Sequence, residues 1–207
     1  MVGFIYFSKT SLSWKCLKKD YSIYYIFYLL RYSMTVNENV LEKSKQTKII
    51  ASKLLDENNI LKTLSQVGTP LIIGSYALDI MVDPDIDIVV QTDFPKQKAK
   101  EALNIFIEKE TVQKYEFGDF VKFPRKNRPI WYIVNLRVEY EDTKREIEIW
   151  FLENIDIYKE QLDTYKSKIN EENRLQILNA KQERNTLGQT KHNRSSIKIY
   201  DEILNTN

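Results

Sequence analysis

Apolar residues recur at helical spacing over residues 40–64, in a segment that is otherwise polar and charged. The pair Leu54/Leu55 is typical of this pattern, and the Gly-Thr-Pro sequence at residues 68–70 ends it. The run Leu71–Ile73 that follows is apolar and short, as in a buried strand. These residues therefore predict a long helix followed by a first strand.

Two further elements are predicted before residue 110. Residues 76–81 have room for one or two helical turns, and Asp83-Pro84 breaks them. The alternation over residues 86–90 predicts a second strand. From Pro95 onward an apolar stripe at helical spacing predicts a helix, because proline is tolerated in a first helical turn.

The second half of the chain predicts a hairpin and then helices. Residues 130–140 and 145–152 alternate between apolar and polar positions, which favours two antiparallel strands. Beyond Asn154 the pattern is helical, with a break at Gly188 and a last helix beginning near Ser195. Together the elements predict an α/β (α+β) domain with a mixed sheet, helices on one side of it and a C-terminal helical segment.

The aromatic-rich residues 1–33 differ in composition from the remainder of the chain. Their apolar run, residues 22–32, is shorter than the roughly 20 residues that a membrane-spanning helix needs, and no small-residue cleavage site follows it. We expect an extension outside the fold, with Met34 as the start of the main domain (34–155) and a helical segment over residues 156–207. A membrane-surface anchor is the competing interpretation of the extension.

Charge and composition narrow the chemistry. The 31 basic and 29 acidic residues give a net charge of +2, which supplies no strong signal for nucleic acid. The single cysteine, Cys16, cannot form an intramolecular disulfide, and the single histidine, His192, excludes a histidine-rich zinc site. Metal chemistry would therefore use oxygen ligands, in a protein that we expect to be cytoplasmic.

Carboxylates alternate with isoleucine at two places. Asp85 and Asp87 lie on one face at the start of a predicted strand, and Glu146 and Glu148 repeat the pattern on a later one. If these strands are neighbours, the carboxylates converge and can hold Mg²⁺ or Mn²⁺, which prefer such ligands. Two metals about 3.5–4 Å apart suit displacement at phosphorus. The plainer interpretation is a pair of half-exposed strands.

The Gly74-Ser75 pair ends the first predicted strand, ten residues before Asp85. Glycine permits a tight turn that opens backbone amides and the Ser75 hydroxyl toward a phosphate. Gly-Ser, a short helix, Asp-x-Asp on a strand and a later acidic strand together resemble the DNA polymerase beta-like nucleotidyltransferase superfamily, over residues 68–152.

The resemblance implies a metal-dependent enzyme that moves a nucleoside monophosphate from a nucleoside triphosphate, such as ATP, to an acceptor hydroxyl, with release of pyrophosphate. The acceptor would be a small molecule, a protein or an RNA end. It also implies roles for five residues: phosphate contacts for Gly74 and Ser75, metal binding for Asp85 and Asp87, and metal binding with proton abstraction for Glu148. Glu146 is the fallback for the last role.

The sequence departs from the family pattern directly after this turn. Many minimal members continue Gly-Ser-x-Ala-Arg-Gly, whereas this chain has Leu78 and Asp79 in place of the arginine and the second glycine. The departure favours an alternative function, a catalytically degenerate binding or regulatory module such as an antitoxin. A glycosyltransferase is a third hypothesis, but there Asp-x-Asp follows an apolar strand, and here the apolar residues 88–90 come after it.

A basic stretch precedes and enters the hairpin and contains no acidic residue: Lys122, Arg125, Lys126, Arg128 and Arg137. We expect Arg125 and Lys126 to contact the triphosphate, with Trp131 or Tyr132 offering a stacking face for a base. A solvated loop beside core aromatics is the competing interpretation.

Overall fold

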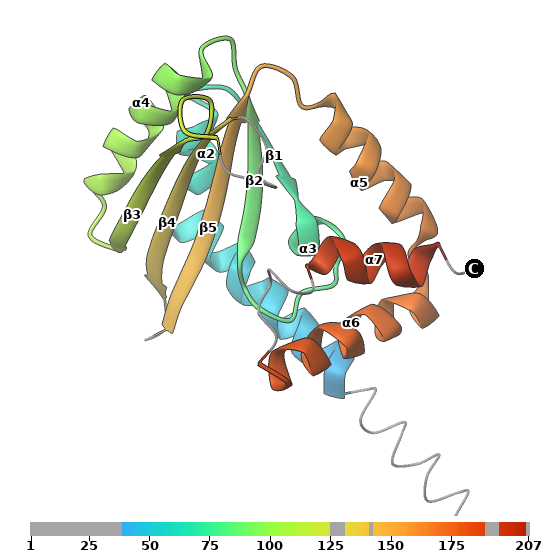
Figure 1. Ribbon diagram of the computed structural model, residues 1–207. Helices are drawn as coiled ribbons and strands as arrows, with labels where there is room; N and C mark the ends of the chain where they lie inside the picture. The colour runs from blue at the N-terminus through green and yellow to red at the C-terminus, as the bar shows by residue number, and fades with distance from the viewer. Residues whose placement is uncertain (1–38, 125–130, 141–142, 189–194, 206–207) are drawn as a thin grey trace, which may run out of the picture. The chain divides into compact units, whose positions relative to one another are not determined.

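The computed structural model describes residues 39–124, 131–140, 143–188 and 195–205, and in these residues five strands form one mixed sheet (Figure 1). The strands are β1 Thr69–Ile73, β2 Ile86–Gln91, β3 Val112–Asp119, β4 Tyr132–Tyr140 and β5 Thr143–Leu152, in the order β1-β2-β5-β4-β3. The β2–β5 pair is parallel, and the other neighbouring pairs are antiparallel. The expected mixed sheet and hairpin are confirmed.

The edge strand β3 was not expected from the sequence. Its central residues, Gln113 to Glu116, are exposed, and its pairing with β4 is irregular between Val112 and Lys114. An edge strand buries little side-chain surface, and charged residues there protect it from pairing with other chains. The alternation that reveals a half-buried strand is therefore weak at these positions.

The described helices are the helix over residues 39–57, α2 Ile60–Leu64, α3 Gly74–Ala77, α4 Pro95–Ile107, α5 Asp156–Lys168, α6 Glu171–Thr186 and α7 Ser196–Leu204. The first long helix, expected as continuous, is interrupted at Asn59, whose φ is 50°. Asparagine tolerates this left-handed conformation better than most residues do. Among the described residues, no helix is both long and apolar enough to cross a membrane.

One face of the sheet carries the main core. Ile86 and Ile88 of β2 and Ile147 and Ile149 of β5 are fully buried there, against the helix over residues 39–57 and α4. Strand residues alternate between faces, so the residues between these isoleucines project from the opposite face. The fold therefore fixes which face of β2 and β5 is available for chemistry.

The C-terminal helices pack on the β1 side of the sheet (Figure 1). Ile177 and Leu178 of α6 and Leu204 of α7 share a buried cluster with Leu78 and Ile80, which follow β1 in the chain. Residues 40–207 form one unit, and the helical segment packs directly against the loop that leads into β2. Its expected break at Gly188 is present, with φ +62°.

Candidate functional site

Strand pairing brings two of the expected carboxylates together. Asp87 of β2 lies directly opposite Glu148 of β5 in the parallel register, between fully buried isoleucine pairs. Neighbouring strands lie about 4.8 Å apart, so both side chains leave the same face from adjacent positions. Both residues are partly exposed. The open face of the sheet thus carries a pair of neighbouring acidic side chains.

The third expected carboxylate, Asp85, immediately precedes β2 and is also partly exposed. Within the described ranges, no three His, Cys, Asp or Glu side chains form a group that could hold a metal ion. Mg²⁺ in phosphoryl-transfer sites is commonly bound by one or two carboxylates, waters and the substrate's own phosphates, without a cage made wholly of protein. The oxygen donors of Asp87 and Glu148 fit that mode of binding.

Glu146, the fallback for the third carboxylate, is engaged elsewhere. It lies opposite Arg137 of β4, and Arg137 Nη2 is 2.6 Å from Glu146 Oε1. Arg137 belongs to the basic stretch expected to contact the triphosphate, and here it forms an exposed ion pair with Glu146. The register therefore distinguishes the two glutamates: Glu148 lies opposite Asp87, and Glu146 lies opposite Arg137.

The Gly-Ser turn lies against the Asp87 carboxylate. Antiparallel pairing of β1 with β2 sets Ile73 opposite Asp87, so the next residue, Gly74, turns directly beside that side chain. Gly74 has φ +65°, and a Cβ added to it would lie 2.5 Å from Asp87 Oδ2. Only glycine allows this left-handed turn and this close approach together. Its absent side chain leaves the carboxylate room beside the turn.

The two departures from the family pattern have a structural account. Asp79, at the position of the second glycine, keeps a left-handed backbone with φ 56°, and its carboxylate pairs with Lys48. Aspartate is one of the few residues besides glycine that visit this conformation. Leu78, in place of the arginine, is buried among the C-terminal helices. Position 79 therefore has a left-handed backbone, which glycine favours, without being a glycine.

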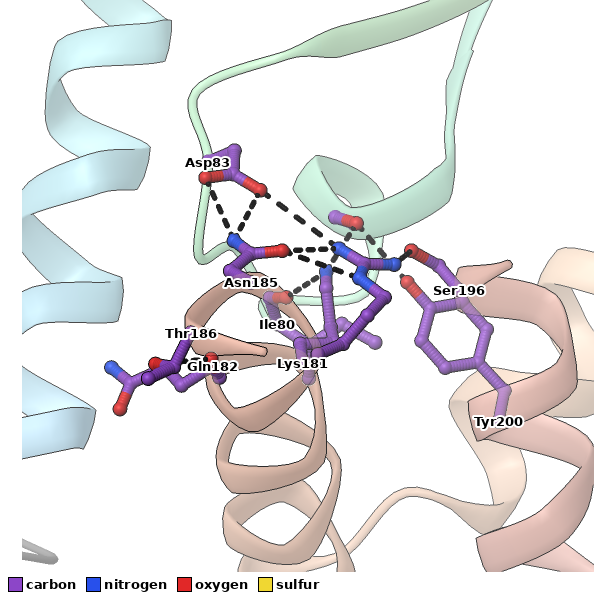
Figure 2. Close-up of polar contacts among 10 residues, drawn as sticks. Ile80, Asp83, Lys181, Gln182, Asn185, Thr186, Ser196 and Tyr200 are labelled. Carbon is purple, nitrogen blue, oxygen red and sulfur yellow. Dashed lines mark hydrogen bonds and ion pairs between the residues drawn. The ribbon is translucent and has the colours of Figure 1, made fainter. Parts of the chain in front are cut away.

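A buried lysine reaches the same turn from α6, as Figure 2 shows. Lys181 is only 3% exposed, and its ammonium donates to Ser75 Oγ at 2.7 Å and to the Ile80 carbonyl at 2.7 Å. The Tyr200 hydroxyl of α7 lies 3.0 Å from Ser75 Oγ. Burial raises the pKa of Tyr200 to about 12, and the charge of Asp87 acts in the same direction. The phenol therefore stays protonated at neutral pH.

A second buried cation, Arg184, lies one helical turn further along α6. Its guanidinium donates to Asn185 Oδ1 at 3.1 and 3.2 Å and to Ser196 Oγ at 3.2 Å. Asn185 in turn donates to both oxygens of Asp83, at 3.0 and 3.2 Å (Figure 2). Arg184 Nη2 is 3.9 Å from Asp83 Oδ2. These contacts tie the loop that precedes Asp85 to the C-terminal helices.

The sequence interpretation assigned no role to these C-terminal residues. One signal was available: Lys181 and Arg184 fall at positions i+4 and i+7 from the buried Ile177, on the apolar stripe of their helix. Charged residues on such a stripe are rarely fully buried without partners. Tyr200 gave no comparable signal, because an aromatic residue on a helix usually belongs to the core.

The expected basic and aromatic contacts have different outcomes. Arg125 and Lys126 lie outside the described residues. Trp131 packs against Trp150 and Tyr158, with ring centroids 5.9 and 5.6 Å apart. Trp131 and Tyr132 both line a cavity of about 560 Å³ at the far end of β2 from Asp87. A base-stacking role for either ring beside the carboxylates remains a prediction.

Asn135 of β4 adds a third polar side chain beside Asp87 and Glu148. It lies opposite Glu148, and its Oδ1 is buried without a hydrogen-bond partner in the described part of the chain. Buried polar atoms usually have hydrogen-bond partners, because a buried polar atom without one lowers the stability of the fold. The open face therefore carries Asp87, Glu148 and Asn135 side by side across three strands.

Comparison with known proteins establishes the fold. No protein-family model matches the chain, and no curated protein matches it in sequence. Among solved structures, the GLD-2/RNP-8 complex matches with a TM-score of 0.54 and 12% identity, over 79% of this chain and 62% of that chain. The Cid1 poly(U) polymerase, in a structure with Mg and 3′-dATP bound, matches with a TM-score of 0.50 and 14% identity, over 71% of this chain and 46% of that one.

These likenesses confirm that the chain has the nucleotidyltransferase fold expected from its sequence. The chain spans 62% and 46% of the lengths of these two chains. At 12% and 14% identity the likeness concerns the fold, and the reaction must be argued from the residues themselves.

Proposed function

We propose that this protein is a metal-dependent nucleotidyltransferase, which moves a nucleoside monophosphate from a nucleoside triphosphate to an acceptor hydroxyl and releases pyrophosphate. One observation carries the proposal. In a nucleotidyltransferase fold, Asp87 is opposite Glu148 on the open face of the sheet, and the Gly74-Ser75 turn lies against Asp87. The Gly-Ser turn thus lies beside Asp87, which is opposite Glu148.

Asp87 and Glu148 would hold Mg²⁺ or Mn²⁺ together with the phosphates of the substrate, and we propose Asp85 as a further ligand, since oxygen donors are the type these ions prefer. A bound divalent ion neutralises charge on the triphosphate and lowers the pKa of the acceptor hydroxyl. The protein's own contribution is to fix these carboxylates on neighbouring strands, where a buried isoleucine core limits their movement.

The phosphates would lie on the β1 side of Asp87. Ser75 offers a hydroxyl there, and the Lys181 ammonium lies 2.7 Å from that hydroxyl. Lys181 brings positive charge to the Gly-Ser turn in surroundings that exclude most water, and Arg184 is a second buried cation on the same helix. Such charges stabilise the negative charge that develops on leaving pyrophosphate more strongly than they would in bulk solvent.

The acceptor would approach from the β5 side. In an in-line displacement the attacking oxygen and the leaving oxygen lie on opposite sides of the phosphorus atom. With the phosphates held at Ser75, the attacking hydroxyl lies toward Glu148, which accepts its proton. Arg137 and Lys114, further along this face, each pair with a carboxylate. The net charge of +2 supplies no strong field for a long nucleic acid, so a small molecule, a protein hydroxyl or a short RNA end is the better candidate acceptor.

A catalytically degenerate binding module is the alternative function. It is favoured by Leu78, because the arginine of the family pattern is replaced here by a buried apolar residue. The two functions differ in whether a nucleoside triphosphate binds in a metal-dependent way.

The test is isothermal titration of a non-hydrolysable ATP analogue with and without Mg²⁺. We expect Mg²⁺-dependent binding by the wild-type protein and its loss in Asp87→Asn. Glu146→Gln is the matched control, because it removes the same kind of charge from the same face without touching Asp87. Labelled nucleoside triphosphates and a panel of acceptors then identify the acceptor.

A well-folded wild-type protein that binds no analogue with either Mg²⁺ or Mn²⁺ would refute the enzymatic proposal and leave the binding module. Equal losses in Asp87→Asn and Glu146→Gln would show that general surface charge, and not this site, binds the nucleotide.

A further inference from the structure

The hydrogen-bonding capacity of Ser75 is almost fully used inside the protein. A serine hydroxyl has one proton to donate and two lone pairs to accept with. The Lys181 ammonium can only donate, so its 2.7 Å contact occupies one lone pair of Ser75 Oγ. The Tyr200 hydroxyl, 3.0 Å away, can act either as donor or as acceptor. The direction of this second bond decides where the Ser75 proton points.

If Ser75 donates to Tyr200, it has no proton left for a phosphate. If Tyr200 donates to Ser75, both lone pairs of Ser75 are occupied and its own proton is available outside this cluster. A phosphate oxygen accepts hydrogen bonds but cannot donate them when it is ionised. An incoming triphosphate therefore favours the second arrangement.

The surroundings of Tyr200 favour the same direction. Arg184 donates to Ser196 Oγ at 3.2 Å, and Ser196 lies one helical turn before Tyr200 on α7. Since Arg184 can only donate, Ser196 has its proton available for the Tyr200 oxygen. Tyr200 then has its own proton available for Ser75. Donation from Ser196 to Tyr200 and from Tyr200 to Ser75 is the arrangement that leaves the Ser75 proton available; Figure 2 shows Ser196 and Tyr200 on α7.

Packing holds the Tyr200 ring in place. Tyr200 is 2% exposed, and the ring of Tyr165 meets it edge-on with centroids 5.6 Å apart. The Tyr165 hydroxyl instead donates to Asp201 Oδ1 at 2.9 Å and accepts from Gln161 Nε2 at 3.4 Å. Tyr165→Phe therefore removes the same chemical group from a neighbouring ring, which makes it a matched control for Tyr200→Phe.

We propose that Tyr200 is a positioning residue for the nucleotide's phosphates: its hydroxyl donates to Ser75 Oγ, so that Ser75, already bonded to Lys181, directs its proton toward the triphosphate. This inference rests on the proposed function. It extends the site to α7, a helix that contributes to binding through Ser75 and need not touch the substrate.

The test is a double-mutant cycle on binding of the non-hydrolysable ATP analogue with Mg²⁺. We expect Tyr200→Phe to weaken binding about five- to tenfold, as for loss of one hydrogen bond between uncharged groups. Ser75→Ala weakens binding at least as much, and adding Tyr200→Phe to it has no further effect, because no serine hydroxyl remains to be directed. Tyr165→Phe binds like wild type. Inorganic tripolyphosphate, used as a competitor, loses affinity by the same factor in Tyr200→Phe.

Three results overturn the inference. Unchanged binding in Tyr200→Phe, with binding lost in Asp87→Asn, rejects it while the proposed function stands. Multiplicative losses in the double mutant show that Tyr200 acts independently of Ser75. Absence of binding by the wild-type protein rejects the proposed function, and this inference with it. Thermal unfolding of each variant checks folding, and Ser196→Ala tests the same chain of hydroxyls if Tyr200→Phe does not fold.

Discussion

Replacing Gly74 by alanine tests whether the close approach of this turn to Asp87 controls nucleotide affinity, separately from its effect on stability. Two features oppose a side chain there: the φ of +65°, and the 2.5 Å between an added Cβ and Asp87 Oδ2. Gly188 supplies the control, because it has nearly the same φ, +62°, and an added Cβ would meet no atom within 4 Å. The two substitutions therefore share the backbone strain, and only the new Cβ at position 74 contacts Asp87.

The magnitudes follow from these distances. A non-glycine residue in the left-handed region costs about 1–2 kcal/mol, and both variants incur this cost. In Gly74→Ala the carboxylate oxygen must also retreat by about 0.9 Å to reach an ordinary 3.4 Å contact. The carboxylate is the end of a flexible side chain, so this retreat adds little to the loss of stability. A displacement of about 1 Å in a catalytic group, however, can reduce function roughly 100-fold.

We therefore expect similar unfolding free energies for Gly74→Ala and Gly188→Ala in urea denaturation, both about 1–2 kcal/mol below wild type. Titration of the ATP analogue with Mg²⁺ distinguishes them: affinity falls by roughly 10- to 100-fold in Gly74→Ala and is unchanged in Gly188→Ala. Equal affinities in the two variants would show that the turn does not control Asp87, and the reasoning from the close approach would be refuted.

Three further predictions concern the fold and α7. Phe106→Ala, in the fully buried core, lowers the unfolding free energy by about 3–5 kcal/mol, whereas Phe94→Ala, 65% exposed, changes it by less than about 0.5 kcal/mol in the same denaturation assay. Ser195→Ala removes the side-chain cap of α7 and lowers the unfolding free energy by about 1 kcal/mol. A decrease in melting temperature smaller than that caused by a substitution in an exposed loop would contradict the capping role. Because the pKa of Tyr200 is about 12 when folded and 10.0 when free, the unfolded phenol ionises first. Stability is therefore full below pH 10 and falls by on the order of 2–3 kcal/mol toward pH 12, and this decrease is shallower in Tyr200→Phe.

The local pattern of the chain predicted most elements correctly. The alternation in β2, β4 and β5 and the spacing in α4 follow from burial on one face, which each segment shows by itself. The edge strand β3 was not predicted, because its exposed residues carry no such alternation. The break at Asn59 also depends on a single backbone conformation that apolar spacing does not reveal.

The sequence by itself also determined the acidic and Gly-Ser candidates, since the residue types and short spacings are local properties. Whether Glu146 or Glu148 joins Asp87 depended on strand order and register, and these are set by pairing between segments about 60 residues apart. The approach of Lys181 and Tyr200 to Ser75 joins positions 106 and 125 residues apart. Periodicity within one helix shows which face is buried, but not which loop it is buried against. Only the packing of α6 and α7 on the turn after β1 brought Lys181 and Tyr200 to Ser75, the proposed phosphate contact.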